Sequence, residues 1–269
     1  MSFKKLKKGI ALSLSVLAIT SSLSMNAFAD TDNNTETITT DVNVASISTT
    51  PAQDAVINSY MSTIKSKSDQ RNIQSYIASL NYKKNFDYDK ELQKISKKYN
   101  DGDILNEKDT KIIFESFILE AENEMANASA RAGSSSKSIP SKTLTKYNTK
   151  VTLSGTMYQN IALGGGTNTY RGNVKVVRNS GATTSVEMTT YHSGYGGAGW
   201  NGSFPEIGLI HNGSVNHTQS TTGANYGMDK SNRYNGLLIC YTTMWTKATV
   251  TVKSGQAFDI ASATWKSTQ

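Results

Sequence analysis

The feature that most constrains this chain is a change of hydrophobic period across residues 127–142. Before this stretch, apolar residues recur every three or four positions, as in Val56, Tyr60 and Ile64, which is the spacing of one helix face. After it, short runs alternate between apolar and polar residues and are separated by Gly, Asn and Ser turns, as strands are. The sequence therefore predicts an α+β chain of two domains, in which a small N-terminal helical bundle is followed by an all-β C-terminal domain, an antiparallel β-sandwich or compact barrel.

The boundary stretch is predicted to be a flexible linker. It consists of small polar residues with Gly133 and Pro140, and it has neither a helical nor a strand period. Arg131 makes it an expected site of proteolysis, because exposed loops of this composition are where proteases cut. The expected parts are a signal peptide at 1–29, a disordered polar segment at 30–50, an acidic helical domain at 51–128, a linker at 129–142 and a basic β-domain at 143–269.

The helical part has recognisable helix starts. Pro51 suits the first turn of a helix, and Asp87 is a predicted N-cap. The longest helix is expected to begin at Asn106 or Asp109. Its spacing predicts a buried face that holds Leu105, Ile112, Ile113 and Phe117.

The N-terminus predicts export. Lysines within residues 4–8 precede a short apolar stretch, and Ala27-Phe28-Ala29 supplies the small residues of a cleavage site, so we expect cleavage after Ala29. The single cysteine, Cys240, excludes an intramolecular disulfide. We expect a secreted, extracellular protein of a Gram-positive bacterium, whose envelope chemistry does not depend on disulfides, with no transmembrane segment in the mature chain.

Charge divides unevenly along the chain. The formal net charge is +7, but residues 30–130 hold 11 basic and 17 acidic residues, whereas residues 131–269 hold 13 basic and 4 acidic ones. Opposite net charges attract over a Debye length of about 8–10 Å. We expect the acidic segment to be a partner of the basic one. We expect the basic segment to seek an anionic membrane or cell-wall polymer, and we expect no nucleic-acid partner.

Candidate catalytic residues form no known motif. His192, His211 and His217 match no zinc-binding spacing, and we interpret them as ordinary loop or edge histidines. Cys240 has apolar neighbours, which is typical of a buried and inert thiol. The sequence predicts no metal and no cofactor, and it leans against an enzyme without excluding one.

Aromatic and basic residues of the β segment favour a binding function. Aromatic rings among small polar residues suit sugar faces or a membrane interface, and basic residues suit anionic polymers. The alternative is that the aromatic residues fill the core and that the positive charge aids solubility. The candidate binding residues are Arg171, Lys175, Arg178, Tyr195, Trp200, Tyr226 and Arg233.

The order of the parts suggests a pre-pro-protein. An export signal, an acidic helical segment, a cleavable linker and a basic compact domain resemble, in outline, large secreted bacteriocins and toxins that are released as C-terminal fragments. This resemblance implies an antibacterial or membrane-acting domain and an acidic pro-region, and it assigns no residue roles. The rival hypothesis is a non-toxic extracellular cell-wall or carbohydrate-binding module with an uncut linker. A hydrolase that uses His192 or Glu187 ranks third.

Overall fold

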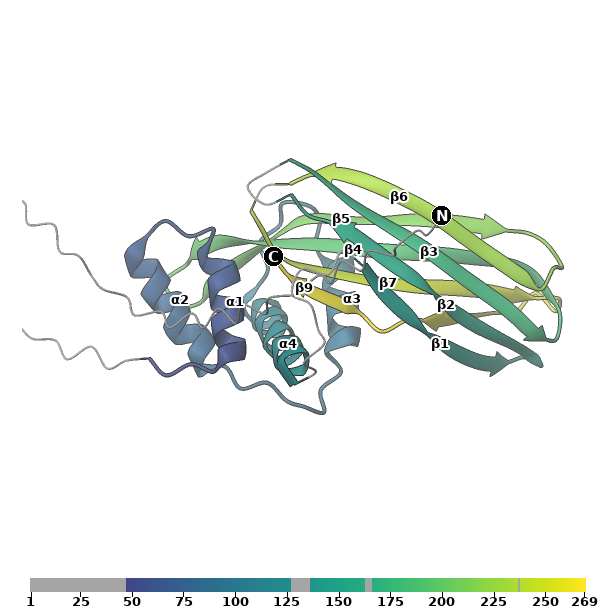
Figure 1. The fold of residues 1–269 in the computed structure, drawn as a ribbon, viewed down its shortest axis with the longest axis horizontal. Helices are drawn as coiled ribbons and strands as arrows, with labels where there is room; N and C mark the ends of the chain where they lie inside the picture. Colours follow the sequence, from purple (N-terminus) through teal and green to yellow (C-terminus); the bar gives the residue numbers. More distant parts are fainter. Residues whose placement is uncertain (1–46, 127–135, 163–165, 237) are drawn as a thin grey trace, which may run out of the picture. The chain divides into compact units, whose positions relative to one another are not determined.

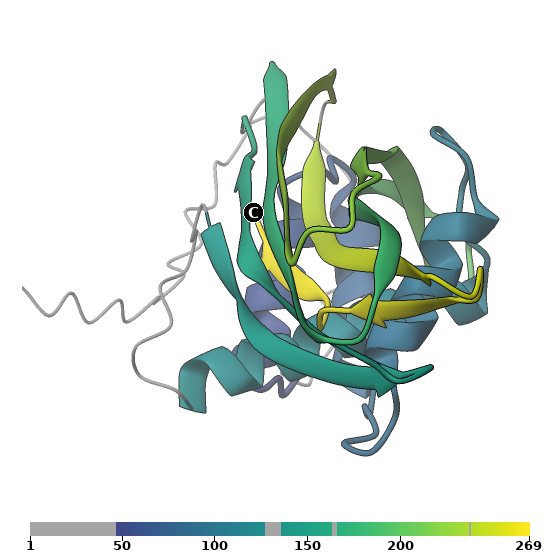
Figure 2. The same cartoon turned by 90° about the vertical axis from the view of Figure 1, so that its right-hand side faces the viewer.

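A computed structural model describes residues 47–126, 136–162, 166–236 and 238–269. Within these residues, four helices are followed by nine strands that form two antiparallel sheets (Figure 1; Figure 2 shows the same ribbon turned by 90°). The expected order of a helical and an all-β part is confirmed. The helices are α1 (Pro51–Met61), α2 (Lys67–Ser79), α3 (Tyr88–Lys98) and α4 (Glu107–Ala126). The strands are β1 (Ser136–Lys146), β2 (Thr149–Asn160), β3 (Thr167–Ser180), β4 (Thr183–Trp200), β5 (Pro205–Gln219), β6 (Asn225–Asn235), β7 (Ile239–Val252), β8 (Ala257–Ala261) and β9 (Trp265–Thr268).

The helices begin where the sequence predicts. Thr50 caps α1 through a capping box with Gln53, and Pro51 occupies the first turn. The Asp87 side chain accepts a hydrogen bond from the backbone N–H of Lys90 at the start of α3. The Asn106 side chain accepts one from the backbone N–H of Asp109 before α4. The residues predicted for the buried face of this last helix are all buried, namely Leu105, Ile112, Ile113 and Phe117.

The two sheets have different strand orders. One is four-stranded, in the order β1-β2-β3-β6. The other is five-stranded, in the order β5-β4-β7-β8, with β9 also paired to β7. Residues 193–199, which their glycines suggest to be a loop, lie inside β4. A Cβ atom at Gly197 would stand 3.0 Å from the ring of Tyr60, so the missing side chain lets helix α1 pack directly onto the strand.

The helices share a hydrophobic core with the five-stranded sheet. The Tyr241 ring on β7 lies 4.8 Å from the ring of Phe117 and 6.0 Å from that of Phe114, centroid to centroid, both on α4. Ile207 and Leu209 of β5 belong to the same cluster. A second cluster is built from residues of both sheets and excludes the helices. Helices and sheets therefore form one compact unit in which the five-stranded sheet contributes to both cores.

Backbone hydrogen bonds also join the helical part to the sheet. The loop between α3 and α4 runs along the edge of β5, where the N–H of Gly102 donates to the carbonyl of Leu209 at 2.7 Å. The N–H of Leu105 donates to the carbonyl of Ile207 at 2.8 Å. The loop thus covers part of a sheet edge whose backbone groups would otherwise be unpaired.

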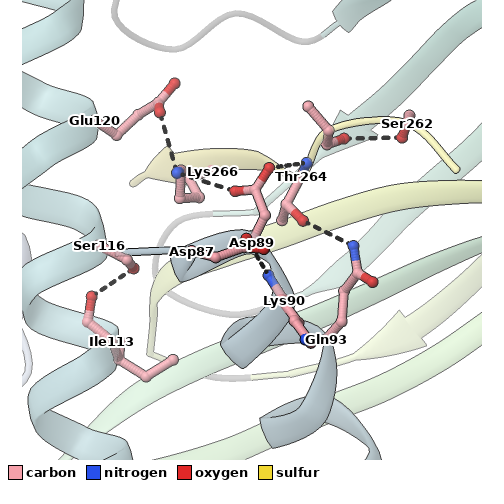
Figure 3. Close-up of polar contacts among 11 residues, drawn as sticks. Asp87, Asp89, Lys90, Gln93, Ile113, Ser116, Glu120, Ser262, Thr264 and Lys266 are labelled. Atoms are coloured by element: carbon pink, nitrogen blue, oxygen red, sulfur yellow. Dashed lines mark hydrogen bonds and ion pairs between the residues drawn. The ribbon is translucent and has the colours of Figure 1, made fainter. Parts of the chain in front are cut away.

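A buried lysine adds an ionic contact to this junction. Lys266 of β9 lies between two carboxylates of the helices, with its Nζ 3.4 Å from Asp89 Oδ1 and 3.5 Å from Glu120 Oε2 (Figure 3). Asp89 also accepts a hydrogen bond from the backbone N–H of Thr264 at 2.9 Å. Since the Lys266 side chain is only 8% exposed, the two carboxylates are what make its burial tolerable.

The structure differs from the expected linker in one respect. Residues 136–142 lie in β1, where Ile139 is buried and a register shift falls between Ile139 and Lys142, around Pro140. An edge strand accepts proline and polar residues because one of its sides has no ladder partner, so its composition resembles that of a linker. The expected cleavage positions, Ala29 and Arg131, lie outside the described residues.

Candidate anion-binding face

Basic residues gather on one sheet. The strands of the four-stranded sheet carry nine basic residues and one acidic residue, whereas those of the five-stranded sheet carry two basic and three acidic ones. The helices pack against the five-stranded sheet, as the shared core shows. The positive charge of the β segment is therefore concentrated on the four-stranded sheet, which contributes no residue to the core shared with the helices.

Strand alternation points three of the predicted residues outward. Along β3, Arg171 and Lys175 are exposed, and Tyr170, Val174 and Val176 between and beside them are buried. Because side chains alternate between the two faces of a strand, this pattern places both cations on the outer face. The neighbouring strand β6 adds Arg233, which is also exposed and pairs in register with Thr169.

A hollow of about 330 Å³ lies over strands β2, β3 and β6. At its wall, the guanidinium carbon of Arg171 stands 5.2 Å from the centroid of the Tyr158 ring. The Arg171 Nε donates to Asp229 Oδ1 at 2.5 Å, and this hydrogen bond lowers the pKa of the Asp229 carboxyl. The lining residues are Tyr158, Gln159, Asn160, Thr169, Tyr170, Arg171, Ser231, Asn232 and Arg233.

A second hollow, of about 410 Å³, lies next to the first over strands β3 and β6. It is lined by residues of β3 and β6 that include Lys175 and Asp229. The two hollows are neighbours in register, because Arg171 pairs with Ser231 and Lys175 with Gly227, four residues along each strand. Together they offer cations, hydroxyls and amides along one extended path, which suits an anionic polymer better than a compact small molecule.

The remaining predicted residues have structural contacts. Arg178 donates from its guanidinium to the carbonyls of Thr222 and Gly223, at 2.9 and 3.3 Å, and so fixes the turn before β6. Tyr226 is buried, and its hydroxyl donates to the carbonyl of Gly223 at 2.7 Å.

Two aromatic residues lie on the helix side of β4. Tyr195 is fully buried in the core shared with the helices. Trp200 is half-buried and packs edge-on against Tyr76 of α2, with 6.4 Å between ring centroids. The expectation that Tyr195 and Tyr226 lie at the surface is thus corrected, because composition cannot tell which face of a strand a ring occupies.

The sequence reasoning missed Tyr158 and Asp229, although strand alternation and the scarcity of carboxylates in this segment could have signalled them.

Two of the three histidines meet inside the β segment. His192 of β4 is fully buried and stacks on Tyr170, with 4.8 Å between ring centroids, and His211 of β5 stacks on Tyr234 at 3.8 Å. Burial, with a smaller contribution from the charge of His211, lowers the pKa of His192 to about 3. Both ring nitrogens of His192 lack a hydrogen-bond partner among the described residues. At neutral pH the His192 ring is therefore uncharged, because its pKa lies well below 7.

Among the residues that the structure describes, Cys240 and the metal-binding residue types give no second candidate site. Burial raises the pKa of the Cys240 thiol, so the reactive thiolate is disfavoured. Among the described residues, no group of three or more His, Cys, Asp or Glu side chains is placed to hold a metal ion. Over the same residues, no helix has the length and apolarity needed to span a membrane.

Comparison with known proteins leaves the family open. No family model matches the chain, and no curated protein does. Among solved structures, a similar chain is described as the X-ray structure of Northeast Structural Genomics Consortium target SoR45. It has 13% sequence identity and a TM-score of 0.26, and the match covers 46% of this chain and 90% of that one. Likeness at this level carries no functional argument.

Proposed function

We propose that this chain is a secreted bacterial pre-pro-protein whose basic β segment binds the anionic envelope of other cells, in the manner of a bacteriocin or toxin. The observation that carries the proposal is the segregation of nine basic residues onto the four-stranded sheet. Within it, Arg171, Lys175 and Arg233 line two consecutive hollows with Ser, Thr and Asn side chains between them. A sheet face with this charge can engage several phosphates or carboxylates of a polymer or lipid surface at once.

The proposal includes a β-sandwich for the β segment. Its support is the second hydrophobic cluster, in which Val151 and Val174 of one sheet join Val186 and Val250 of the other. Two sheets that share a core in this way each keep an outer face. One outer face is then available to the helices and the other to the envelope.

The helical part is proposed to be a pro-region that is cut from the β segment near Arg131. Its described contacts run through the five-stranded sheet, as with Tyr241 and Lys266, and not through the cations proposed to bind. In this scheme the helices support the fold of the β segment instead of neutralising its binding face, which differs from the simple charge pairing that the sequence suggests.

A charge-neutralising variant tests the proposal. Each basic residue near an anionic lipid surface contributes about 1 kcal/mol, so the triple change Arg171→Gln, Lys175→Gln and Arg233→Gln is expected to weaken binding roughly 100-fold. The measurement is sedimentation with phosphatidylglycerol vesicles and, separately, binding to polyphosphate. Both variants are made in the uncut chain, and the matched control changes three exposed lysines of the helical part, Lys83, Lys84 and Lys90, to Gln, which alters the net charge equally.

Each outcome of this comparison is informative. Binding that falls in the first variant and not in the control supports the basic face as the contact surface. Equal losses in both variants would show that net charge alone governs binding and would overturn the assignment of the face. Absence of binding by the unaltered protein to both anionic probes would remove the proposed function.

A second candidate function is a carbohydrate-binding module, which the Tyr158 ring and the hydroxyl and amide groups of the first hollow favour. Aromatic rings with polar neighbours are typical of sugar-binding surfaces. This alternative predicts that retention on peptidoglycan or polysaccharide survives salt of about 1 M, where the Debye length is about 3 Å. It further predicts that Tyr158→Ala abolishes retention and that the triple Gln variant does not.

A further inference from the structure

Asp229 is the one acidic residue on the strands of the four-stranded sheet. It lies on β6 in register with Asn173 of β3. It is exposed and its neighbour Met228 is buried, so strand alternation places the carboxylate on the outer face, together with the cations. A carboxylate among these cations repels a chain of bare phosphates and weakens its binding. The presence of Asp229 therefore bears on which anion this face accepts.

Asp229 and Arg171 form a pair that offers acceptors and donors side by side. Nε and Nη2 of Arg171 donate to the two carboxylate oxygens of Asp229. A guanidinium has more N–H donors, and a carboxylate more acceptor sites, than this pairing uses. Phosphate oxygens can use only the remaining donors, whereas a hydroxyl group both donates and accepts. The pair therefore suits a ligand with hydroxyl groups better than one with phosphate alone.

The surroundings of the pair have matching chemistry. The Tyr158 ring stands at the wall of the first hollow, and an aromatic ring suits the C–H side of a polyol or a sugar. A row of hydroxyl and amide side chains crosses the sheet in register with Asp229, namely Asn173 on β3, Thr156 on β2 and Ser138 on β1. These groups form hydrogen bonds with hydroxyls in either direction, as donor or as acceptor.

Two cations flank the pair along the same strands. Arg233 of β6 pairs in register with Thr169, and Lys175 lies six residues beyond Thr169 on β3. With a rise of about 3.3 Å per residue, the two cations stand about 20 Å apart along the strands. The register places Arg171 and Asp229 between them. A ligand that reaches both cations is therefore an extended chain, and it passes over the pair.

The outer face has little with which to enter a membrane. Among the residues that the structure describes, none of the exposed large apolar side chains lies on β1, β2, β3 or β6. Surfaces that insert into a bilayer carry such side chains, because they bury them below the headgroups. The composition of the face thus favours a hydrated polymer over a lipid bilayer.

We propose that the outer face of the four-stranded sheet binds a phosphodiester polymer that carries free hydroxyl or sugar groups. Arg233 and Lys175 contact its phosphates, and the pair of Arg171 and Asp229 holds a hydroxyl-bearing unit between them. The inference rests on the proposed function and names its partner as a wall polymer. It differs from the carbohydrate-binding alternative because it requires the cations as well as the hydroxyl contacts.

The test substitutes one carboxylate in the full, uncut chain. Asp229→Asn keeps the size of the side chain and removes its charge. Its ion pair with Arg171 is exposed, so we expect the variant to fold, which thermal unfolding checks. The matched control is Asp259→Asn on β8 of the other sheet. Asp259 is 54% exposed against 53% for Asp229, and it also pairs with a cation, Lys247, so both variants gain one positive charge.

Binding is measured with poly(glycerol phosphate), which has a hydroxyl group in each repeat, and with polyphosphate, which has none. Loss of a hydrogen bond to a charged group weakens binding roughly 10- to 100-fold. Removal of a repelling charge strengthens the binding of an anion about fivefold. We therefore expect Asp229→Asn to weaken binding to poly(glycerol phosphate) about fivefold and to strengthen binding to polyphosphate about fivefold. Asp259→Asn should change neither.

Opposite changes for the two polymers support the inference. If Asp229→Asn strengthens the binding of both polymers or alters neither, Asp229 does not contact hydroxyl groups, and the inference is overturned while the proposed function stands. The same holds if the protein binds polyphosphate or phosphatidylglycerol vesicles but not poly(glycerol phosphate). If it binds none of the three probes, the inference and the proposed function are both overturned.

Discussion

The buried histidine of the β segment gives a prediction with a definite sign and magnitude. His192 is fully buried against Tyr170 of β3, with His211 of β5 and Tyr234 of β6 facing it, and Asp101 of the helical part lies 3.6 Å from His211 Nδ1. Its pKa in the folded protein is about 3, mainly because burial disfavours the charged ring. In the unfolded chain the pKa of a histidine is about 6.5. Folding must therefore remove a proton from this ring between about pH 3 and pH 6.5.

The direction of the effect follows from proton linkage. Above about pH 6.5 neither state binds the proton, and His192 does not make stability depend on pH. As the pH falls from 6.5 towards 3, only the unfolded state binds it, so the free energy of unfolding falls by about 1.4 kcal/mol per pH unit. At pH 5 the accumulated loss is about 2 kcal/mol, a large share of the 5–15 kcal/mol that is usual for a protein of ordinary stability.

The assay is urea unfolding followed by tryptophan fluorescence at pH 7.5 and pH 5.0, for the unaltered protein and for His192→Phe. The phenyl ring keeps a flat group against Tyr170 and cannot bind a proton. Comparing the two pH values within each protein cancels the packing cost of the substitution. We expect the variant to lose about 2 kcal/mol less on acidification than the unaltered protein. His217→Gln, which removes a half-buried histidine outside this cluster, serves as the control, and equal losses in all three proteins would refute the reasoning.

Three further predictions concern the junction between helices and sheet. Phe117→Ala should cost about 3–5 kcal/mol in urea unfolding, and the helical and strand signals should still be lost together, whereas separate transitions would argue against a shared core. Lys266→Met should destabilise the protein by about 1–3 kcal/mol, because Asp89 and Glu120 lose their cation. Lys247→Met breaks the more exposed pair with Asp259 and should destabilise it by less than about 1 kcal/mol. Equal costs of the two substitutions would contradict the role given to burial. A chain cut by protease between residues 126 and 136 should elute as one particle on size exclusion in 1 M salt, and separation of the two pieces would contradict the shared core.

Much of the architecture could be predicted from local signals. Helix caps at Asp87 and Asn106, the apolar face of α4 and the alternation along β3 depend on neighbours within a few residues, which the sequence displays directly. The shared core could not be predicted in this way. The contact between Phe117 and Tyr241 joins residues far apart in sequence. The apolar run 237–241 predicts a strand buried on both faces; Leu238 is half exposed and departs from this prediction, and the run does not say which element covers each face of Ile239–Tyr241.

The candidate site divides in the same way into residues that local signals predict and residues that depend on distant contacts. The cations Arg171, Lys175 and Arg233 lie outward, as expected for charged residues on strands. Tyr195 stands among glycines, which suggests an exposed loop, yet Gly197 allows helix α1 to pack closely on β4 and Tyr195 is buried in the shared core. Tyr158 was overlooked because its partnership with Arg171 depends on the register between β2 and β3.

The contacts of the helices change what cleavage near Arg131 would accomplish. If charge pairing alone held the helical part, high salt would release it, because exposed pairs are screened. Instead, the junction consists of buried aromatic contacts such as Phe117 with Tyr241, of backbone hydrogen bonds from Gly102 and Leu105 to β5, and of the largely buried Lys266. These interactions persist in salt, so a cut chain should remain one particle until something stronger separates its parts. Acid is a candidate, because below about pH 6.5 His192 binds a proton in the unfolded state and not in the folded one, so acidification destabilises the fold in which both parts share a core. Cleavage would then make separation of the two parts possible, and acidification would bring it about. In 1 M salt we expect the two pieces of a cut chain to stay associated at pH 7.5 and to separate at pH 4.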